Sequence, residues 1–134
     1  MPKSNFVLDT NIWLSLIITQ KLNDVLVILK AKTIQVFVRE ELLDEIEEVL
    51  NRAKLSKYIF EPPEYYIELI NRHTINHATQ KYYHESPDDD DNYLYDLCMG
   101  TKSTLVTGDK LLLAHKSEPL VDTITFDIFK KSIK

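Results

Sequence analysis

The chain has 134 residues, of which 44% are hydrophobic and 28% charged, and its formal net charge is −5 at pH 7. This length allows one domain with a hydrophobic core and is short for two, so we expect a single domain over residues 1–134. The acidic balance argues against a protein that holds nucleic acid through a broad basic face. It does not exclude a protein that grips phosphates through a metal ion, because a bound cation inverts the charge of an acidic pocket.

Three features of the sequence bear on the cellular compartment. Cys98 is the one cysteine of the chain, so no internal disulfide can form, and a reducing compartment fits. The longest apolar run, residues 12–19, is far shorter than a membrane span. Residues 1–5 lack the apolar core of a signal peptide. We therefore expect a cytoplasmic protein with no membrane-spanning segment.

Short apolar runs alternate with helical patterns along the first half of the chain. A short apolar run bounded by polar residues is typical of a buried strand, and apolar residues spaced by three and four indicate an amphipathic helix. Thr10 or Asn11 follows the first run and can cap the helix after it. The patterns predict strands over residues 5–8 and 34–38, a helix that ends near residues 19–20, and helices over residues 22–29 and 40–54.

The second half continues the alternation. Pro62 and Pro63 stop any helix before them, and the helix that follows is predicted to turn Tyr65 and Leu69 toward the core, with Ile70 as a further candidate. Residues 73–86 are the least legible part of the chain. The patterns predict a helix over residues 64–72, a candidate strand over 75–79, a helix over 88–99, a strand over 103–106, a short helix or turn over 111–113, a strand over 123–126 and a closing helix from 127.

Strands that alternate with helices indicate a parallel sheet covered by helices on both faces. We therefore predict an α/β fold with three layers, α/β/α, around a central parallel sheet of about five strands.

Two aspartates come just after strand-like runs. Asp9 follows the run over residues 6–8, and Asp109 follows the run over residues 105–107. In open parallel sheets, ligands bind outside the carboxyl ends of the strands. An aspartate in such a position is about as often a turn or cap residue, so position alone leaves both interpretations open.

Glu45 lies at the rim of the apolar arc of its predicted helix, three residues after Leu42 and four before Val49. Carboxylates at such a rim are common in solvated helices. A functional and a purely solvated Glu45 therefore stay equally open at this point.

Asp91 lies inside an apolar stripe, because Leu94, Tyr95 and Cys98 follow it by three, four and seven residues. The acidic run over residues 88–91 also suits the positive end of a helix dipole. That explanation accounts for the run but not for a member that points inward, so we favour a functional Asp91. Asp88 is a lesser candidate from the same turn.

Four carboxylates that converge at one edge of a sheet repel one another unless they are protonated or bound to a metal. Oxygen ligands alone select Mg²⁺ or Mn²⁺ over zinc. The four histidines show no competing ligand spacing, and the sequence contains no Gly-rich phosphate loop or nucleophile elbow. The predicted ligand set is Asp9, Glu45, Asp91 and Asp109.

Four segments resemble motifs of the PIN-domain ribonucleases. Residues 6–12 (FVLDTNI) resemble the opening motif of that family, and residues 105–112 (LVTGDKLL) resemble its C-terminal motif. Residues 40–55 resemble the second acidic helix, and residues 88–98 resemble the third acidic segment. The likeness covers most of the chain and keeps the order and spacing of the motifs. It is strongest to the VapC-like branch, the toxin components of bacterial toxin–antitoxin pairs.

The resemblance implies a ribonuclease that hydrolyses RNA phosphodiester bonds with Mg²⁺ or Mn²⁺. It also implies an antitoxin partner and a homodimer. Arg39 is a departure, because the family often has a serine there. The residues carried over are the acidic quartet Asp9, Glu45, Asp91 and Asp109 and the supporting groups Asn11 and Thr107. Lys110, Lys102 and Lys54 are candidate contacts for flanking phosphates, although any one of them is more often a solvated surface lysine.

Three other functions fit parts of the pattern. A haloacid-dehalogenase-like phosphotransfer enzyme would use Asp9 as its nucleophile, but it usually has a second aspartate two residues on, where this chain has Asn11. A receiver domain requires an acidic pair after the first strand and a phosphoacceptor after the third, and neither is evident. A PIN-fold protein-interaction module without catalysis is the third alternative, and the four carboxylates argue against it.

Overall fold

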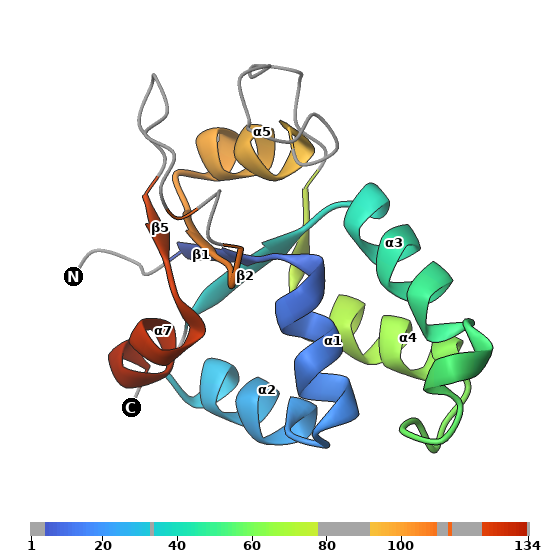
Figure 1. The fold of residues 1–134 in the computed structure, drawn as a ribbon. Helices are drawn as coiled ribbons and strands as arrows, with labels where there is room; N and C mark the ends of the chain where they lie inside the picture. The colour runs from blue at the N-terminus through green and yellow to red at the C-terminus, as the bar shows by residue number, and fades with distance from the viewer. Residues whose placement is uncertain (1–4, 33, 78–91, 110–112, 114–121, 134) are drawn as a thin grey trace.

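The computed structural model describes residues 5–32, 34–77, 92–109, 113 and 122–133. In this part of the chain, five parallel strands form one sheet in the order β3-β2-β1-β4-β5 (Figure 1). The predicted parallel sheet of about five strands is thus confirmed. The strands are β1 (Asn5–Leu8), β2 (Gln35–Val38), β3 (Ile75–Asn76), β4 (Thr104–Val106) and β5 (Thr123–Ile124).

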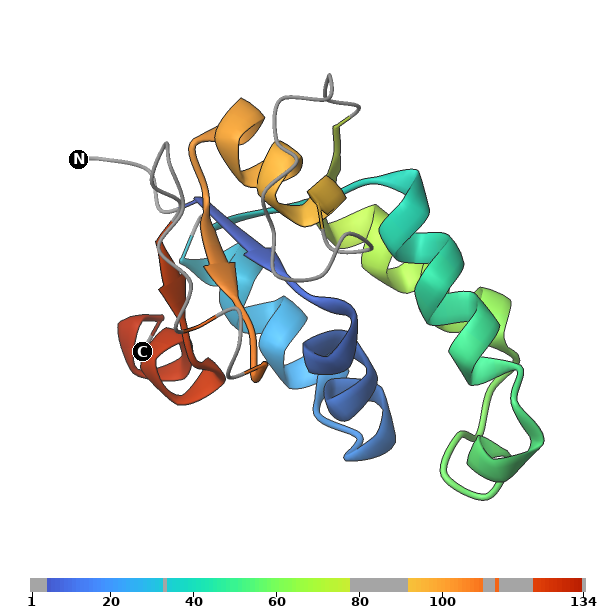
Figure 2. The same ribbon diagram turned by 45° about the horizontal axis from the view of Figure 1, so that its top comes forward.

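Helices cover both faces of this sheet (Figures 1 and 2). Helix α5 packs on β1, β2 and β4 from one side, and α2 and α7 lie on the other. Helix α1 continues from β1 and packs on α3, which in turn packs on α4. The predicted α/β/α layering is therefore confirmed. The helices are α1 (Thr10–Ile18), α2 (Leu22–Ala31), α3 (Glu40–Leu50), the 3₁₀ turn η1 (Ala53–Leu55), α4 (Pro63–His73), α5 (Asn92–Thr101) and α7 (Phe126–Ser132).

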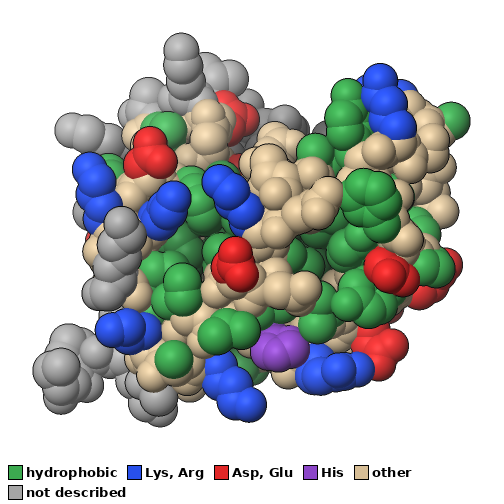
Figure 3. All heavy atoms as spheres, turned by 90° about the horizontal axis from the view of Figure 1, so that it is seen from below, with side chains coloured by type: hydrophobic (Ala, Val, Ile, Leu, Met, Phe, Trp, Pro, Cys, Tyr) green, Lys and Arg blue, Asp and Glu red, His purple; other side chains and the backbone are tan. Residues whose placement is uncertain are grey.

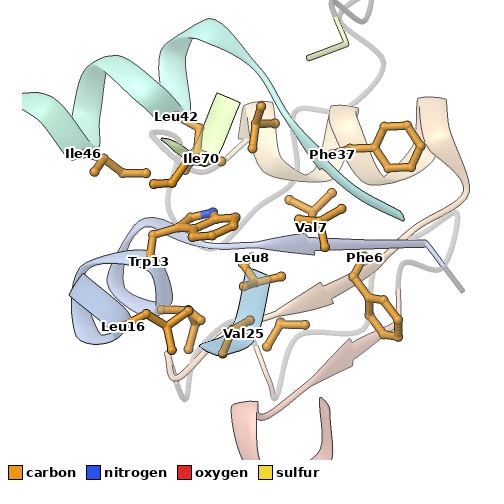
Figure 4. Packing of buried hydrophobic residues seen from close by; sticks show 14 of the residues in the cluster. Phe6, Val7, Leu8, Trp13, Leu16, Val25, Phe37, Leu42, Ile46 and Ile70 are labelled. Carbon is orange, nitrogen blue, oxygen red and sulfur yellow. The ribbon is translucent and has the colours of Figure 1, made fainter. Parts of the chain in front are cut away.

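The central strand β1 buries side chains on both of its faces. Phe6 and Leu8 point toward the side of α2, where Val25 lies, and Val7 points to the opposite side (Figure 4). This alternation follows from the two-residue period of a strand, and burial on both faces is normal for a parallel sheet between helices. Phe6 also meets Phe129 of α7 edge to face, with ring centroids 4.8 Å apart. The core therefore extends through both layers around β1.

Two predicted boundaries are wrong for local reasons. The helix predicted over residues 40–54 ends at Leu50, because Arg52 has a ψ of 132° and leaves the helical region before η1 begins. The strand predicted over residues 123–126 ends at Ile124, because Thr125 caps α7 by accepting a hydrogen bond from the Ile128 N–H at 3.3 Å. Both segments keep their predicted type.

Helix α4 turns two of its three predicted residues toward the core. Tyr65 is 44% exposed, whereas Ile70 is fully buried and Leu69 is partly buried. Tyr66 is half-buried, and its hydroxyl oxygen accepts a hydrogen bond from the Phe60 N–H at 3.3 Å. The prediction is therefore confirmed for Leu69 and Ile70 and wrong for Tyr65, because Tyr66 and not Tyr65 packs against the core.

None of the helices in the described ranges is long and apolar enough to cross a membrane alone. Helices α1 and α2 together reach the length and composition of a span, but they are bent by 115° at their junction. Their apolar side chains, such as Trp13 and Leu26, are buried in the core of this domain.

The face of the molecule seen from below carries hydrophobic side chains among lysines and arginines (Figure 3). Ile128 of α7 is 53% exposed, although its neighbour Phe129 is fully buried. Single exposed apolar residues are normal on a soluble domain. Phe129 and Ile128 are therefore a buried and an exposed residue on the same helix, and their substitutions can be compared directly.

We predict that Phe129→Ala lowers the free energy of unfolding by about 3–5 kcal/mol, because it removes the ring that packs against Phe6 and leaves a cavity. Ile128→Ala is the matched control and is expected to change that free energy by less than about 0.5 kcal/mol. Urea unfolding followed by circular dichroism measures both. Equal effects of the two substitutions would contradict the packing of α7 described here.

Candidate active site

The ends of β1 and β4 lie side by side at the middle of the sheet. In the order β3-β2-β1-β4-β5, the chain moves from β1 toward one edge and from β4 toward the other. The crevice between two such strands is the place where doubly wound sheets bind ligands. The Asp9 N–H donates to the Val106 carbonyl oxygen at 3.0 Å, which extends the pairing by one residue. Asp9 therefore lies at this switch point, beside the end of β4.

Both carboxylate oxygens of Asp9 accept hydrogen bonds. Oδ1 accepts from the Ile12 N–H at 3.0 Å, which makes Asp9 the cap of α1. The prediction that Thr10 or Asn11 caps this helix is therefore wrong by one or two residues. Oδ2 accepts from the Thr107 hydroxyl. The two interpretations of Asp9 do not compete, because one side chain both caps the helix and faces the end of β4.

Asp9 is 5% exposed, and this burial raises the pKa of its carboxyl group above the ordinary value. The hydrogen bonds from Thr107 and from the Ile12 N–H act in the opposite direction. The nearby Asp109 carboxylate raises the pKa of Asp9 further. Asp9 and Asp109 thus lie close enough to repel each other, as a shared cation site requires.

Thr107 connects the two aspartates. Its hydroxyl donates to Asp9, and the same oxygen accepts a hydrogen bond from the Asp109 N–H at 3.1 Å. Thr107 is fully buried, whereas Asp109 is half-buried. The predicted supporting role of Thr107 therefore has a specific geometry in the structure: the threonine fixes both the Asp9 side chain and the turn that carries Asp109.

Glu45 is exposed on α3, but its carboxylate is held from two neighbouring helices. Oε2 accepts a hydrogen bond from the Thr10 hydroxyl of α1 at 3.0 Å and another from the Tyr93 hydroxyl of α5 at 2.5 Å. Thr10 follows Asp9 directly, so Glu45 belongs to the same edge of the sheet. Tyr93 was missed from the sequence, because a tyrosine beside an apolar stripe is ordinarily a packing residue.

The remaining predicted ligand, Asp91, lies outside the described residues, as do Asp88 and Lys110. The stripe that supported Asp91 is present, because Leu94, Tyr95 and Cys98 are all buried. In the described part of the chain, no three His, Cys, Asp or Glu side chains gather closely enough to hold one metal ion. What that part brings together is the pair Asp9 and Asp109, with Glu45 tied to the adjoining residue Thr10.

Three other polar residues take positions that the sequence did not reveal. Asp96 is 1% exposed within α5, and its only sequence signal is a charge inside an apolar run. Asn11 is exposed on α1 and lines a groove beside the site. Lys102 precedes β4, at the other end of the strand from Thr107, which does not suit the predicted contact with a phosphate near the site.

The family model described as "PIN domain" matches residues 5–111. The chain therefore belongs to the PIN domain family, whose members are generally nucleases. No curated protein matches the chain. Among solved structures, the chain is similar to the "Structure of T. brucei RRP44 PIN domain", with 14% identity and a TM-score of 0.45 over 97% of this chain and 80% of that chain. The family assignment rests on the family model and not on this structural likeness.

Family membership decides against two of the alternative functions. A haloacid-dehalogenase-like enzyme and a receiver domain belong to other families. The observed strand order also differs from the order 2-1-3-4-5 of receiver-type sheets. The remaining alternative is a PIN domain that binds without catalysis.

We predict that Asp9→Asn removes a pH-dependent loss of stability. Because the pKa of Asp9 is raised in the folded state, the folded protein binds this proton more tightly than the unfolded chain. The free energy of unfolding of the wild type therefore falls as the pH rises from about 3.9, the ordinary aspartate value, through the raised pKa. The asparagine variant keeps an oxygen for the Ile12 N–H and has no charge to bury, so its stability relative to the wild type should increase across this window and remain higher at neutral pH.

Urea unfolding at a series of pH values in EDTA measures this difference. Asp44→Asn is the control, because Asp44 is exposed on α3 and its replacement removes the same charge. A stability difference between Asp9→Asn and the wild type that is constant with pH would contradict the burial argument.

Proposed function

We propose that this protein is a metal-dependent endoribonuclease that hydrolyses phosphodiester bonds of RNA. The observation that carries the proposal is the pair of carboxylates at the switch point of a PIN domain. Asp9 is 5% exposed, and none of the ion pairs among the described residues involves it. A buried ionised carboxylate costs free energy unless an opposite charge compensates it. Asp9 and Asp109 would hold a divalent cation, which would supply that charge.

The donor atoms suit Mg²⁺ or Mn²⁺. Each Asp9 oxygen accepts one hydrogen bond and keeps a further lone pair for a metal. Mg²⁺ sites commonly use one or two carboxylates and fill the remaining positions with water and substrate phosphate oxygens. Asp9 and Asp109 meet that requirement, and we propose that Glu45 and Asp91 complete the shell directly or through water.

The bound metal ion would activate a water molecule and stabilise negative charge at the scissile phosphate. The residues of this chain prepare the site for it. Thr107 and the Ile12 N–H fix the two oxygens of Asp9, and Thr10 and Tyr93 fix Glu45. Ligands that are already oriented lose little freedom when the metal and substrate bind. RNA as the substrate is proposed from the resemblance of the motifs to PIN-domain ribonucleases.

We predict that purified wild-type protein cleaves a labelled structured RNA with Mn²⁺ or Mg²⁺ and that EDTA abolishes the cleavage. Asp9→Asn should lower the rate by on the order of 100-fold or more, because it removes a charged ligand from the site. Asp44→Asn, with the same loss of charge on the exposed side of α3, should cleave at the wild-type rate.

Two results would count against this proposal in different ways. Wild-type cleavage by Asp9→Asn would show that Asp9 is not a ligand. No cleavage by the wild type, together with no Mn²⁺ binding in a calorimetric titration, would favour the non-catalytic binding module.

We further propose that the nuclease is the toxin of a VapC-like toxin–antitoxin pair, that an antitoxin protein neutralises it and that it forms a homodimer. This role rests on the resemblance of the motifs to that branch. Cleavage of an essential RNA would stop protein synthesis, so the role requires that activity and toxicity share the same residues.

Induced expression of the wild type in a bacterial host should therefore arrest growth, and expression of Asp9→Asn at the same level should not. Growth curves and viable counts measure the difference, with Asp44→Asn as the toxic control. Normal growth with a wild type that cleaves RNA in vitro would separate the nuclease from the toxin role.

A further inference from the structure

A groove starts beside the carboxylates and follows α1 away from them. It has a volume of about 430 Å³ and lies between α1 and the end of α3 with η1. Asn11 and Ser15 of α1 and its C-cap residue Thr19 line one side, and they recur every four residues. Val49, Arg52 and Lys54 line the other side. At 1.5 Å per residue, the stretch from Asn11 to Thr19 is about 12 Å long.

One end of this groove adjoins the candidate active site. Asn11 is two residues after Asp9 and directly follows Thr10, whose hydroxyl binds Glu45. Because Asp9 caps α1, the direction of the helix and of the polar row along it is fixed relative to the Asp9 carboxylate. The groove therefore begins within two residues of Asp9 along α1, next to the contact of Thr10 with Glu45.

The charge of the groove differs from that of the chain as a whole. The chain has a net charge of −5, but the described residues that line the groove include Arg52 and Lys54 and no carboxylate. Arg52 makes a long ion pair with Glu48, 3.6 Å between Nη2 and Oε1, with side chains 51% and 74% exposed. Such an exposed pair contributes little and leaves Arg52 available to a phosphate. Lys54 has no hydrogen bond or ion pair with another described residue.

The groove has the right chemistry for a single nucleic-acid strand. Its volume is that of a pocket for one small ligand, which admits a nucleotide or two but not a duplex. Guanidinium and ammonium groups bind phosphate oxygens. The amide and hydroxyls of the polar row can donate to and accept from a ribose 2′-hydroxyl, the group that distinguishes RNA from DNA. Apolar side chains such as Leu14 of α1 and Leu55 of η1 also line the groove, and they offer contact surface to the bases of a bound strand.

We propose that this groove binds the single-stranded RNA segment adjoining the scissile phosphate, with Arg52 and Lys54 contacting its backbone phosphates. The inference rests on the proposed ribonuclease function for its choice of ligand. It assigns to Arg52 and Lys54 a role in holding the substrate and not in the chemical step.

The chain offers a closely matched control for these two residues. A second hollow of about 400 Å³ is lined by Lys30 and Arg72 beside Gln35 and Ile75, where β2 and β3 begin. It therefore lies at the amino edge of the sheet, opposite the carboxylates. Arg72 also pairs with a glutamate one turn earlier, Glu68, at 2.7 Å. Replacing Lys30 and Arg72 by glutamine thus removes the same charges and the same kind of helical ion pair as replacing Arg52 and Lys54.

The test is the binding of a short fluorescent single-stranded RNA, followed by anisotropy in EDTA over a range of salt concentrations. Arg52→Gln/Lys54→Gln should raise Kd by about tenfold or more. It should also reduce the slope of log Kd against log salt by about 1.4, the value for two lost phosphate contacts to a single strand. Lys30→Gln/Arg72→Gln should stay within about twofold of the wild type, and the unfolding midpoints of both variants should be unchanged.

Three outcomes would overturn the inference: no RNA binding by the wild type, equal losses in the two double variants, or competition by duplex RNA as effective as by the single strand. Cleavage after addition of Mn²⁺ tests the nuclease proposal separately. RNA that binds through Arg52 and Lys54 but is not cut would preserve the groove and refute the nuclease. Equal cleavage of RNA at subsaturating concentration by the wild type and by Arg52→Gln/Lys54→Gln would support the nuclease and refute the role of the groove.

Discussion

The hydrogen bond from the Thr107 hydroxyl to the Asp9 carboxylate joins the ends of the two central strands, and the rest of the site is built around it. The other Asp9 oxygen caps α1 through the Ile12 N–H, so the same carboxylate sets where that helix begins. The Thr107 oxygen in turn accepts from the Asp109 N–H and positions the second aspartate. The direction of α1 then places Thr10 against Glu45 and carries the polar side of the groove away from the site. One carboxylate thereby links the sheet, the first helix, the candidate ligands and the proposed substrate path.

Burial of the ionised Asp9 carboxylate lowers the stability of the fold, and the local hydrogen bonds offset this loss only in part. Burial and the neighbouring Asp109 raise the pKa of Asp9, while the bonds from Thr107 and Ile12 favour its ionised form. A structure optimised for stability alone would place a neutral cap such as asparagine at this position. The charge is retained where a cation can bind, and cation binding would stabilise the folded state in return. The destabilising feature of the fold and the proposed chemistry therefore come from the same atoms.

Much of this arrangement follows from the sequence, because it depends on local periodicity and on the rule that ligands lie at the carboxyl ends of parallel strands. That rule was enough to select Asp9 and Asp109. The sequence was less informative where a tertiary contact decides the outcome. Asp9 and not Thr10 caps α1, because the pairing of β1 with β4 carries one residue past the strand. The contact of Tyr93 with Glu45 spans 48 positions and has no local signature. On α4, Tyr66 packs against the core and the predicted Tyr65 is exposed, while Leu69 and Ile70 lie inward as predicted.

The groove gives this acidic chain a local surface that suits RNA. A net charge of −5 gives no long-range attraction to a polyanion, so the chain as a whole should hold RNA weakly. On the proposed function, attraction is confined to a bound cation at Asp9 and Asp109 and to two side chains, Arg52 and Lys54, along a groove too small for a duplex. An RNA strand would be held only where one single-stranded segment contacts the cation and these two side chains at the same time. Such a nuclease discriminates by fit at the site and not by affinity for nucleic acid in general, because the surrounding charge opposes every other mode of binding.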